Sequence, residues 1–181
     1  KRDTSSLGQG SDVLWYHNEP IEINWPNEKV HTFKDEDFVY PISAGLSKWT
    51  GSSPRPIKSF VNHWDVCLNS LTCAKVLKRR NVSVHFCIDN DGTIIQLHDI
   101  DDMCWHAGNR NVNKTSVGVE ISNAYYLKYQ SWYKRNGFGE RPTRDDVWVH
   151  GNKLGEFTWF YPEQLEALKA LWLSLIHISE P

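Results

Sequence analysis

The sequence predicts an α/β domain, because segments with the composition of strands alternate with segments that have the periodicity of helices. Four segments are rich in the β-branched and aromatic side chains that favour strands: residues 57–67, 82–88, 93–97 and 115–122. Residues 71–80 and 162–175 carry apolar side chains at helical spacing. A length of 181 residues suits one domain with a small extension.

The composition excludes some classes of function. The formal net charge is −2, and the short basic cluster Lys78-Arg79-Arg80 suits a solvated helix end that complements the helix dipole. A general nucleic-acid surface needs many clustered cations to neutralise phosphates, so we expect no nucleic-acid partner. No apolar run is long enough to span a bilayer, so we expect no membrane insertion. The four cysteines form no CxxC pair, which favours reduced, buried thiols.

The N-terminal third is less regular. Residues 1–12 are polar and contain Gly and Ser, so they predict a disordered tail that cannot bury enough apolar surface to become ordered. Residues 13–56 are aromatic but interrupted by five prolines. That pattern predicts an extension of irregular structure and short strands wrapped on the domain.

The segment from Ile57 to Cys67 predicts a central strand, on which His63 shares a face with Val61, Asp65 and Cys67. Ser70 is a candidate N-cap for a following helix that ends in basic residues. Strand, turn and helix is the simplest interpretation of this stretch.

Residues 82–88 and 93–97 are joined across Asp89-Asn90-Asp91-Gly92, where Asp-Gly supplies the positive φ that a tight hairpin requires. The alternative is a calcium-binding loop. That pattern would place Cys87 and His98 at ligand positions where carboxylates belong. The hairpin is therefore the favoured interpretation.

The next stretch is a polar loop, residues 99–114, followed by a strand over residues 115–122. Alternation places Glu120 on the face of Gly118 and Ser116, opposite the apolar face, where a carboxylate can line a cleft. Residues 125–146 lack a clean period and predict an insertion. The helix that starts at Pro162 places its leucines and Trp172 on one amphipathic face.

The combination of His63-Trp64-Asp65, the Asp-Gly hairpin, Trp105-His106-Ala107-Gly108 and Val117-Gly118-Val119-Glu120 resembles the zinc-dependent N-acetylmuramoyl-L-alanine amidases. The resemblance is to the type 2 amidase and peptidoglycan recognition protein family, as found in phage endolysins and muropeptide amidases. It implies a mixed central sheet flanked by helices. It also implies Zn²⁺ as cofactor, peptidoglycan or muropeptide as substrate, and cleavage of the amide between N-acetylmuramic acid and L-alanine.

The resemblance also implies roles for individual residues. His63 matches the first zinc histidine, and Glu120 matches a strand-borne glutamate that acts as general base or acid. Trp105 and His106 stand beside the substrate groove, with His106 as a substrate contact and not a metal ligand. Asn109, with Asn113 and Asn123, could donate hydrogen bonds to sugar or peptide carbonyls, although loop asparagines usually serve turns. The alternative for His63 is a satisfied strand histidine, and for Glu120 a salt-bridged surface carboxylate. His85 is expected to orient or pack against its neighbours.

The resemblance predicts that two zinc ligands follow the final helix, on a last strand and loop. Only residues 176–181 follow here, and we expect them to be a non-native tail, with residues 57–175 as an amidase domain whose last strand is missing. His177 lacks the rest of the motif, and His98 and His150 stand outside the family context. One imidazole cannot hold zinc tightly, so this chain alone is expected to be inactive and its full-length parent active.

Two other classes of function stay open. A peptidoglycan-binding module of the same fold would keep the groove and lack the metal. A thiol hydrolase would use Cys87 or Cys104 with His106, although residues this close on a loop rarely reach the geometry of a nucleophile and its base. We further expect a monomer that is synthesised in the cytoplasm and acts on the cell wall.

Overall fold

Five strands form one mixed sheet in the computed structural model, which describes residues 10–178. In the order in which they pair, the strands are β3 (Val30–Thr32), β7 (Ile94–Gln96), β6 (Phe86–Ile88), β9 (Ser116–Ile121) and β5 (Ser59–Trp64). β6, β9 and β5 are mutually parallel, whereas β7 is antiparallel to β6 and parallel to β3. The mixed sheet that the sequence predicts is confirmed. The predicted central position of residues 57–67 is wrong for the described chain, because β5 lies at one edge.

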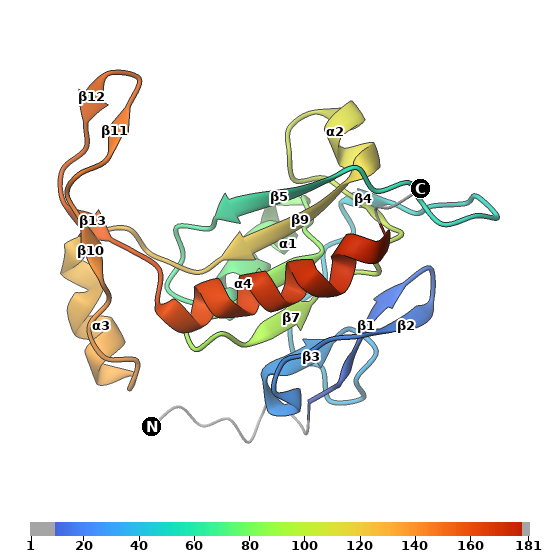
Figure 1. The fold of residues 1–181 in the computed structure, drawn as a ribbon, viewed down its shortest axis with the longest axis horizontal. Coiled ribbons are helices and arrows are strands. Elements are labelled where there is room, and N and C mark those ends of the chain that lie inside the picture. The colour runs from blue at the N-terminus through green and yellow to red at the C-terminus, as the bar shows by residue number, and fades with distance from the viewer. Residues whose placement is uncertain (1–9, 179–181) are drawn as a thin grey trace.

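Helices cover both faces of the sheet. Helix α4 (Pro162–Leu175) crosses one face, and α1 (Ser70–Arg80) lies behind the other (Figure 1). The side chains of β9 at Val117, Val119 and Ile121 belong to the same core as Leu171 of α4. Cys87 of β6 packs instead with residues of α1. The predicted arrangement of a sheet between helices is therefore confirmed.

The two helices begin where local chemistry allows. The N-cap of α1 is Asn69, one residue before the predicted Ser70, and its side chain accepts a hydrogen bond from the backbone N–H of Thr72. Ser70 is instead buried inside the first turn. In α4 the predicted proline start is confirmed, but Leu165 of its predicted apolar face is 42% exposed.

The predicted hairpin is confirmed. β6 and β7 are antiparallel, and Gly92 in the turn has a φ of 79°. The backbone N–H of Asp89 donates to the carbonyl of Thr93 at 2.8 Å, which closes the turn. Gly92 therefore supplies the left-handed conformation that the Asp-Gly pair predicts.

The N-terminal extension does more than wrap the domain. β1 (Val13–Tyr16) and β2 (Glu19–Glu22) form a separate hairpin, and β4 (Leu46–Ser47) pairs with β8 (Met103–Cys104). Strand β3, however, extends the central sheet, a position that the sequence pattern does not indicate. Most of the predicted N-terminal tail lies outside the described residues.

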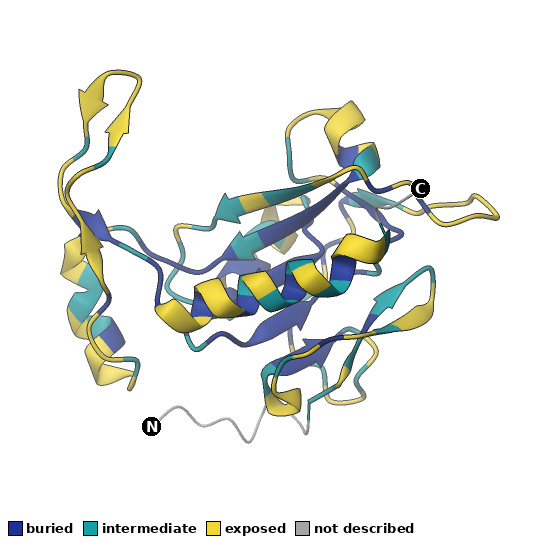
Figure 2. Ribbon diagram, in the orientation of Figure 1, coloured by how far each residue is buried: buried dark blue, intermediate teal, exposed yellow. Residues whose placement is uncertain are grey.

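The remaining elements are short. They are α2 (Arg110–Thr115), α3 (Gln130–Arg135), β10 (Thr143–Arg144), β11 (Trp148–Val149), β12 (Asn152–Lys153), β13 (Phe157–Thr158) and the 3₁₀ turns Asn27–Lys29, Leu127–Tyr129 and Ile176–Ile178. Figure 2 shows that the central strands are largely buried and that the β11–β12 hairpin is exposed and projects from the body. Across the described residues, the helices are too short or too polar to span a bilayer. Of the predicted tail at residues 176–181, Ile176–Ile178 form the last of the 3₁₀ turns, and residues 179–181 lie outside the described range.

Candidate active site

Two of the predicted site residues are neighbours in the sheet. His63 of β5 is the register partner of Glu120 of β9, and Glu120 is in turn the partner of Cys87 of β6. Side chains at paired positions of adjacent strands point to the same face. The alternation of β9 keeps Val119 and Ile121 in the core on the opposite face, so Glu120 faces the α1 side as the sequence predicts.

The turn that contains His106 folds back over β9. A Cβ placed on Gly118 would lie 2.7 Å from both Cγ and Nδ1 of His106, so only glycine allows the imidazole to rest on the strand. The Oδ1 of Asn113 holds the turn by accepting hydrogen bonds from the backbone N–H groups of His106 and Ala107 at 3.3 and 2.9 Å. The close approach at Gly118 therefore brings the loop histidine to the strand face.

His63 and His106 contact each other directly. The Nε2 of His63 is 2.9 Å from the Nδ1 of His106, and the rings meet edge to face. The Nε2 of His106 lies 3.1 Å from the Oγ of Ser116, which can accept its proton and leave the Nδ1 lone pair towards His63. Burial lowers the pKa of His63, and burial together with the neighbouring His63 lowers the pKa of His106 to about 4. Both imidazoles are thus neutral at physiological pH, the form that binds metals.

His85 holds strand β9 in place beside the two histidines. It is fully buried, and its Nδ1 accepts the backbone N–H of Gly118 at 3.0 Å. Its Nε2 is 2.7 Å from the carbonyl of Asp102, which fixes the proton on that nitrogen. Burial and the nearby Arg55 guanidinium lower the pKa of His85 well below its usual value. His85 therefore packs and orients the strand, as the sequence predicts.

Glu120 and His106 line one cavity of about 350 Å³. The lining residues are Leu77, Arg80, Val82, Trp105, His106, Gly108, Asn113 and Glu120. The Oε2 of Glu120 is buried and has no hydrogen-bond partner in the described protein. Burial, with a smaller contribution from Asp65, raises the pKa of Glu120 to about 8, against the opposing charge of Arg80. Glu120 is therefore mostly protonated at neutral pH and can donate a proton into the cavity.

The other two predicted site residues differ in their placement. Trp105 lines the cavity and is 39% exposed, so its ring is available to a ligand. Asn109 does not line it, because its Oδ1 accepts from the backbone N–H groups of Asn111 and Val112 and caps α2. The predicted loop contains this short helix. Of the asparagines that the sequence offers as substrate contacts, Asn113, one turn further on, lines the cavity.

Sequence reasoning also missed several residues of the cavity. Arg80 carries the only cation of the lining, and the basic end of α1 was interpreted only as a solvated helix end. Leu77 and Val82 flank that helix end. Their proximity to Trp105 depends on the tertiary fold, so no local pattern could have revealed it.

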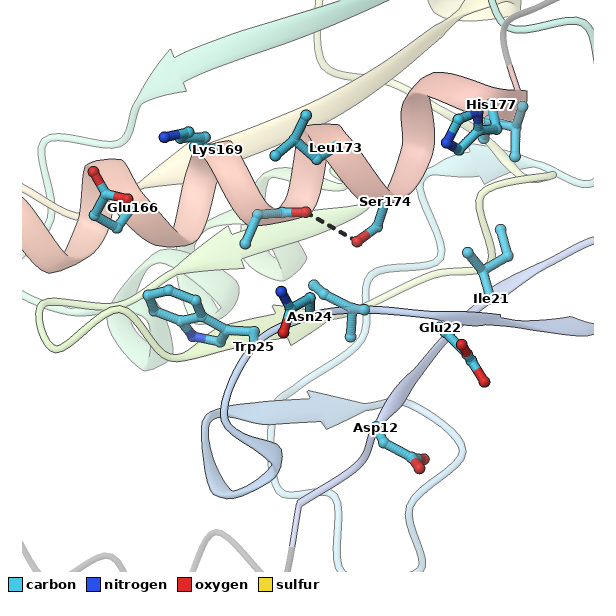
Figure 3. Close-up of a pocket in the computed structure, with 13 residues that line it drawn as sticks. Asp12, Ile21, Glu22, Asn24, Trp25, Glu166, Lys169, Leu173, Ser174 and His177 are labelled. Carbon is cyan, nitrogen blue, oxygen red and sulfur yellow. Dashed lines mark hydrogen bonds between the residues drawn. The ribbon is translucent and has the colours of Figure 1, made fainter.

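A second, larger cavity lies on the side of α4, between that helix and the β1–β2 hairpin. It measures about 840 Å³, and its walls include Trp25, Glu22, Glu166 and Lys169 (Figure 3). None of the predicted site residues lines it. Because His106 and Glu120 line the smaller cavity, we assign the chemistry to that cavity.

The donors available to a metal near Glu120 are His63 and His106. Two nitrogen ligands at about 2.1 Å from one zinc ion stand about 3.4 Å apart in tetrahedral geometry. The two ring nitrogens are 2.9 Å apart and share a hydrogen bond, so a zinc ion would have to displace the proton between them and widen the pair. A catalytic zinc uses about three protein ligands. Among the described residues, only Asp65, Cys67 and Cys73 form a group of three such donors, and neither histidine belongs to it. Imidazole is a suitable ligand for zinc, but two imidazoles are fewer than the three protein ligands that a catalytic zinc uses.

Comparison with protein families gives one match. The family described as N-acetylmuramoyl-L-alanine amidase matches residues 53–179, which is more than half of the chain. This chain therefore belongs to the N-acetylmuramoyl-L-alanine amidase family, as its sequence motifs predict. No match was found among curated proteins.

Solved structures of similar fold come from bacteria and insects. AmpDh3 from Pseudomonas aeruginosa is 21% identical with a TM-score of 0.47, and the match covers 79% of this chain and 55% of that one. AmiD from E. coli, an N-acetylmuramyl-L-alanine amidase in complex with its substrate, is 20% identical with a TM-score of 0.47, covering 74% and 52%. The Drosophila peptidoglycan recognition protein SA is 20% identical with a TM-score of 0.43, covering 76% and 67%. This chain thus spans about half the length of the first two.

Proposed function

We propose that this chain is a zinc-dependent amidase that hydrolyses the bond between N-acetylmuramic acid and L-alanine in peptidoglycan. The observation that carries the proposal is the convergence of Glu120 and His106 on one cavity, with His63 in contact with His106. Family membership supports the class of reaction. In this proposal His63 holds the metal and Trp105 contacts the muropeptide, whereas His106 differs from the expected substrate contact and serves as a second ligand beside His63.

The chemistry divides between the cofactor and the chain. Zinc, when bound, polarises the amide carbonyl and activates water. Glu120 supplies the proton that the leaving amine of L-alanine needs, since its raised pKa keeps the carboxyl protonated at neutral pH. The buried Oε2, which has no partner in the described protein, is the atom available for this transfer. Trp105 and Asn113 border the space in which the amide would lie.

The two imidazoles limit the affinity of this chain for zinc, because a catalytic zinc uses about three protein ligands. We propose that zinc binds weakly here, so that residues 1–181 hydrolyse substrate slowly even when zinc is in excess. The shortage of ligands favours a second candidate function, a peptidoglycan-binding module that keeps the cavity and does not cleave. Action on the cell wall after synthesis in the cytoplasm, as a monomer, belongs to the same proposal.

Release of L-alanyl-D-isoglutamine from N-acetylmuramyl-L-alanyl-D-isoglutamine, followed by mass spectrometry in excess Zn²⁺, tests the proposal. Glu120→Gln should lower the rate of release by roughly 10²–10⁴-fold, while the N-acetylmuramyl substrate still binds. Glu166→Gln, on the exposed side of α4, is the matched control and should leave the rate unchanged. Turnover that survives in Glu120→Gln contradicts the assignment of Glu120. Binding without release by the unaltered chain at any zinc concentration supports the non-catalytic module.

A further inference from the structure

We propose that Asp65, Cys67 and Cys73 form a second metal site, which takes a thiophilic divalent cation such as Zn²⁺ and uses Cys87 as its fourth ligand. The ligand atoms of the first three all lie within 4.8 Å of one another. Donors around a tetrahedral zinc with Zn–S distances of about 2.3 Å stand about 3.8 Å apart. A small movement of the side chains would therefore bring these three donors to ligand spacing, and Cys87, which lies outside this group but interacts with Cys73, would have to move further to complete the site.

The fold holds the first two donors in place. Asp65 follows β5 directly, and its carboxylate accepts the backbone N–H groups of Cys67 and Asn123 and the hydroxyl of Ser122 at 2.8 to 3.0 Å. Both lone pairs of Oδ1 are used by the two backbone N–H groups, so Oδ2, which accepts only the Ser122 hydroxyl, keeps the lone pair that is free for a cation. Val66 between the two donors has a φ of 53°, which is strained for a β-branched residue and turns Cys67 back towards α1. The oxygen ligand is thus fixed before any metal binds.

The sulfur donors come from three segments, which are the turn after β5, α1 and β6. Cys73 lies in the second turn of α1 and its thiol interacts with those of both Cys67 and Cys87. Cys73 and Cys87 are buried, whereas Cys67 is partly exposed and offers an entry path. Three thiols and one carboxylate select zinc over magnesium or calcium, which prefer oxygen ligands. Each thiol that becomes a ligand releases its proton to solvent.

This cluster is separate from the pair of histidines. The Nε2 of His63 is directed at His106, and neither residue belongs to the group of three donors. Cys87 is the register partner of Glu120, so a cation here would cross-link the end of β5, α1 and β6 behind the carboxyl of Glu120. The site would be structural, because its four donors leave no open position for substrate.

Cobalt binding tests this site independently of the proposed catalysis. The chain is reduced, stripped with a chelator and titrated with Co²⁺ in a His63→Ala background that removes the imidazole site. We expect thiolate-to-cobalt charge-transfer absorption that saturates at one equivalent. Cys67→Ser, at the partly exposed donor, should weaken binding by on the order of 100-fold with an unchanged circular dichroism spectrum. Cys73→Ser should abolish it.

Cys104→Ser is the matched control, because Cys104 is a fully buried cysteine outside the cluster and its loss should leave the absorption intact. Three results overturn the proposal. The first is the absence of charge-transfer absorption. The second is absorption that survives in both Cys67→Ser and Cys73→Ser. The third is a Cys67–Cys73 disulfide in the purified chain, together with no metal binding after the disulfide is reduced. Loss of amidase activity alone, with cobalt binding intact, would count against the proposed function only.

Discussion

Replacing Glu120 with glutamine should make the fold more stable at neutral pH than the unaltered chain. Burial raises the pKa of Glu120 from 4.5 to about 8 in the folded protein. Between these two values the unfolded chain has lost the proton while the native state keeps it. The stability that this group contributes is therefore complete below pH 4.5 and is lost as pH rises towards 8.

The size of the effect follows from the two pKa values. At pH 7 the unfolded carboxyl is ionised and the folded one is mostly protonated, which costs the native state about 3 kcal/mol relative to its stability in acid. For a chain of this length that is a shift in Tm of roughly 10 °C. Glutamine cannot ionise, so Glu120→Gln lacks this loss.

Urea unfolding followed by tryptophan fluorescence measures the effect between pH 4.5 and 8. As pH rises to 7, the unfolding free energy of the unaltered chain should fall by about 3 kcal/mol relative to that of Glu120→Gln. Asp65, whose pKa is raised to about 7 by burial, is present in both proteins and its contribution largely cancels. Glu166→Gln should show no such trend. Parallel pH profiles for Glu120→Gln and the unaltered chain would refute the reasoning.

Two further substitutions test how the turn is held over β9. Gly118→Ala places a Cβ 2.7 Å from the His106 ring, so the ring should be displaced and its pKa, now about 4, should rise towards its ordinary value in an NMR titration; an unchanged titration would contradict the close approach. Asn113→Ala removes the acceptor for the backbone N–H groups of His106 and Ala107 and should cost about 1–3 kcal/mol in urea unfolding, with faster hydrogen exchange at the Ala107 amide. Exchange at that amide as slow as in the unaltered chain would show that the turn is held elsewhere.

The features that the sequence predicts well are those specified by local chemistry. The Asp-Gly hairpin, the proline start of α4 and the direction of Glu120 follow from turn conformation and strand alternation, which need only a few neighbouring residues. The short helix α2 was missed because a six-residue helix is too short to show a period.

Contacts between distant segments could not be predicted from local patterns. The approach of His106 to His63 depends on the absence of a side chain at Gly118, which the sequence presents only as a glycine in a strand. The position of β3 in the central sheet is similar, because a three-residue strand more than 60 positions from its partner carries no signal of its pairing. Asn109 and Asn113 are the same residue type in the same loop, so the sequence does not distinguish them. Only the fold makes Asn109 the helix cap and places Asn113 at the cavity.

The most direct test of the account is where a muropeptide binds. A ¹H–¹⁵N NMR titration with N-acetylmuramyl-L-alanyl-D-isoglutamine should shift the indole N–H of Trp105 and the amide of Gly108, which border the cavity beside Glu120. The indole of Trp25, in the cavity under α4, should not move. If Trp25 shifts and Trp105 does not, the ligand binds in the cavity under α4, and the assignment of the active site is contradicted.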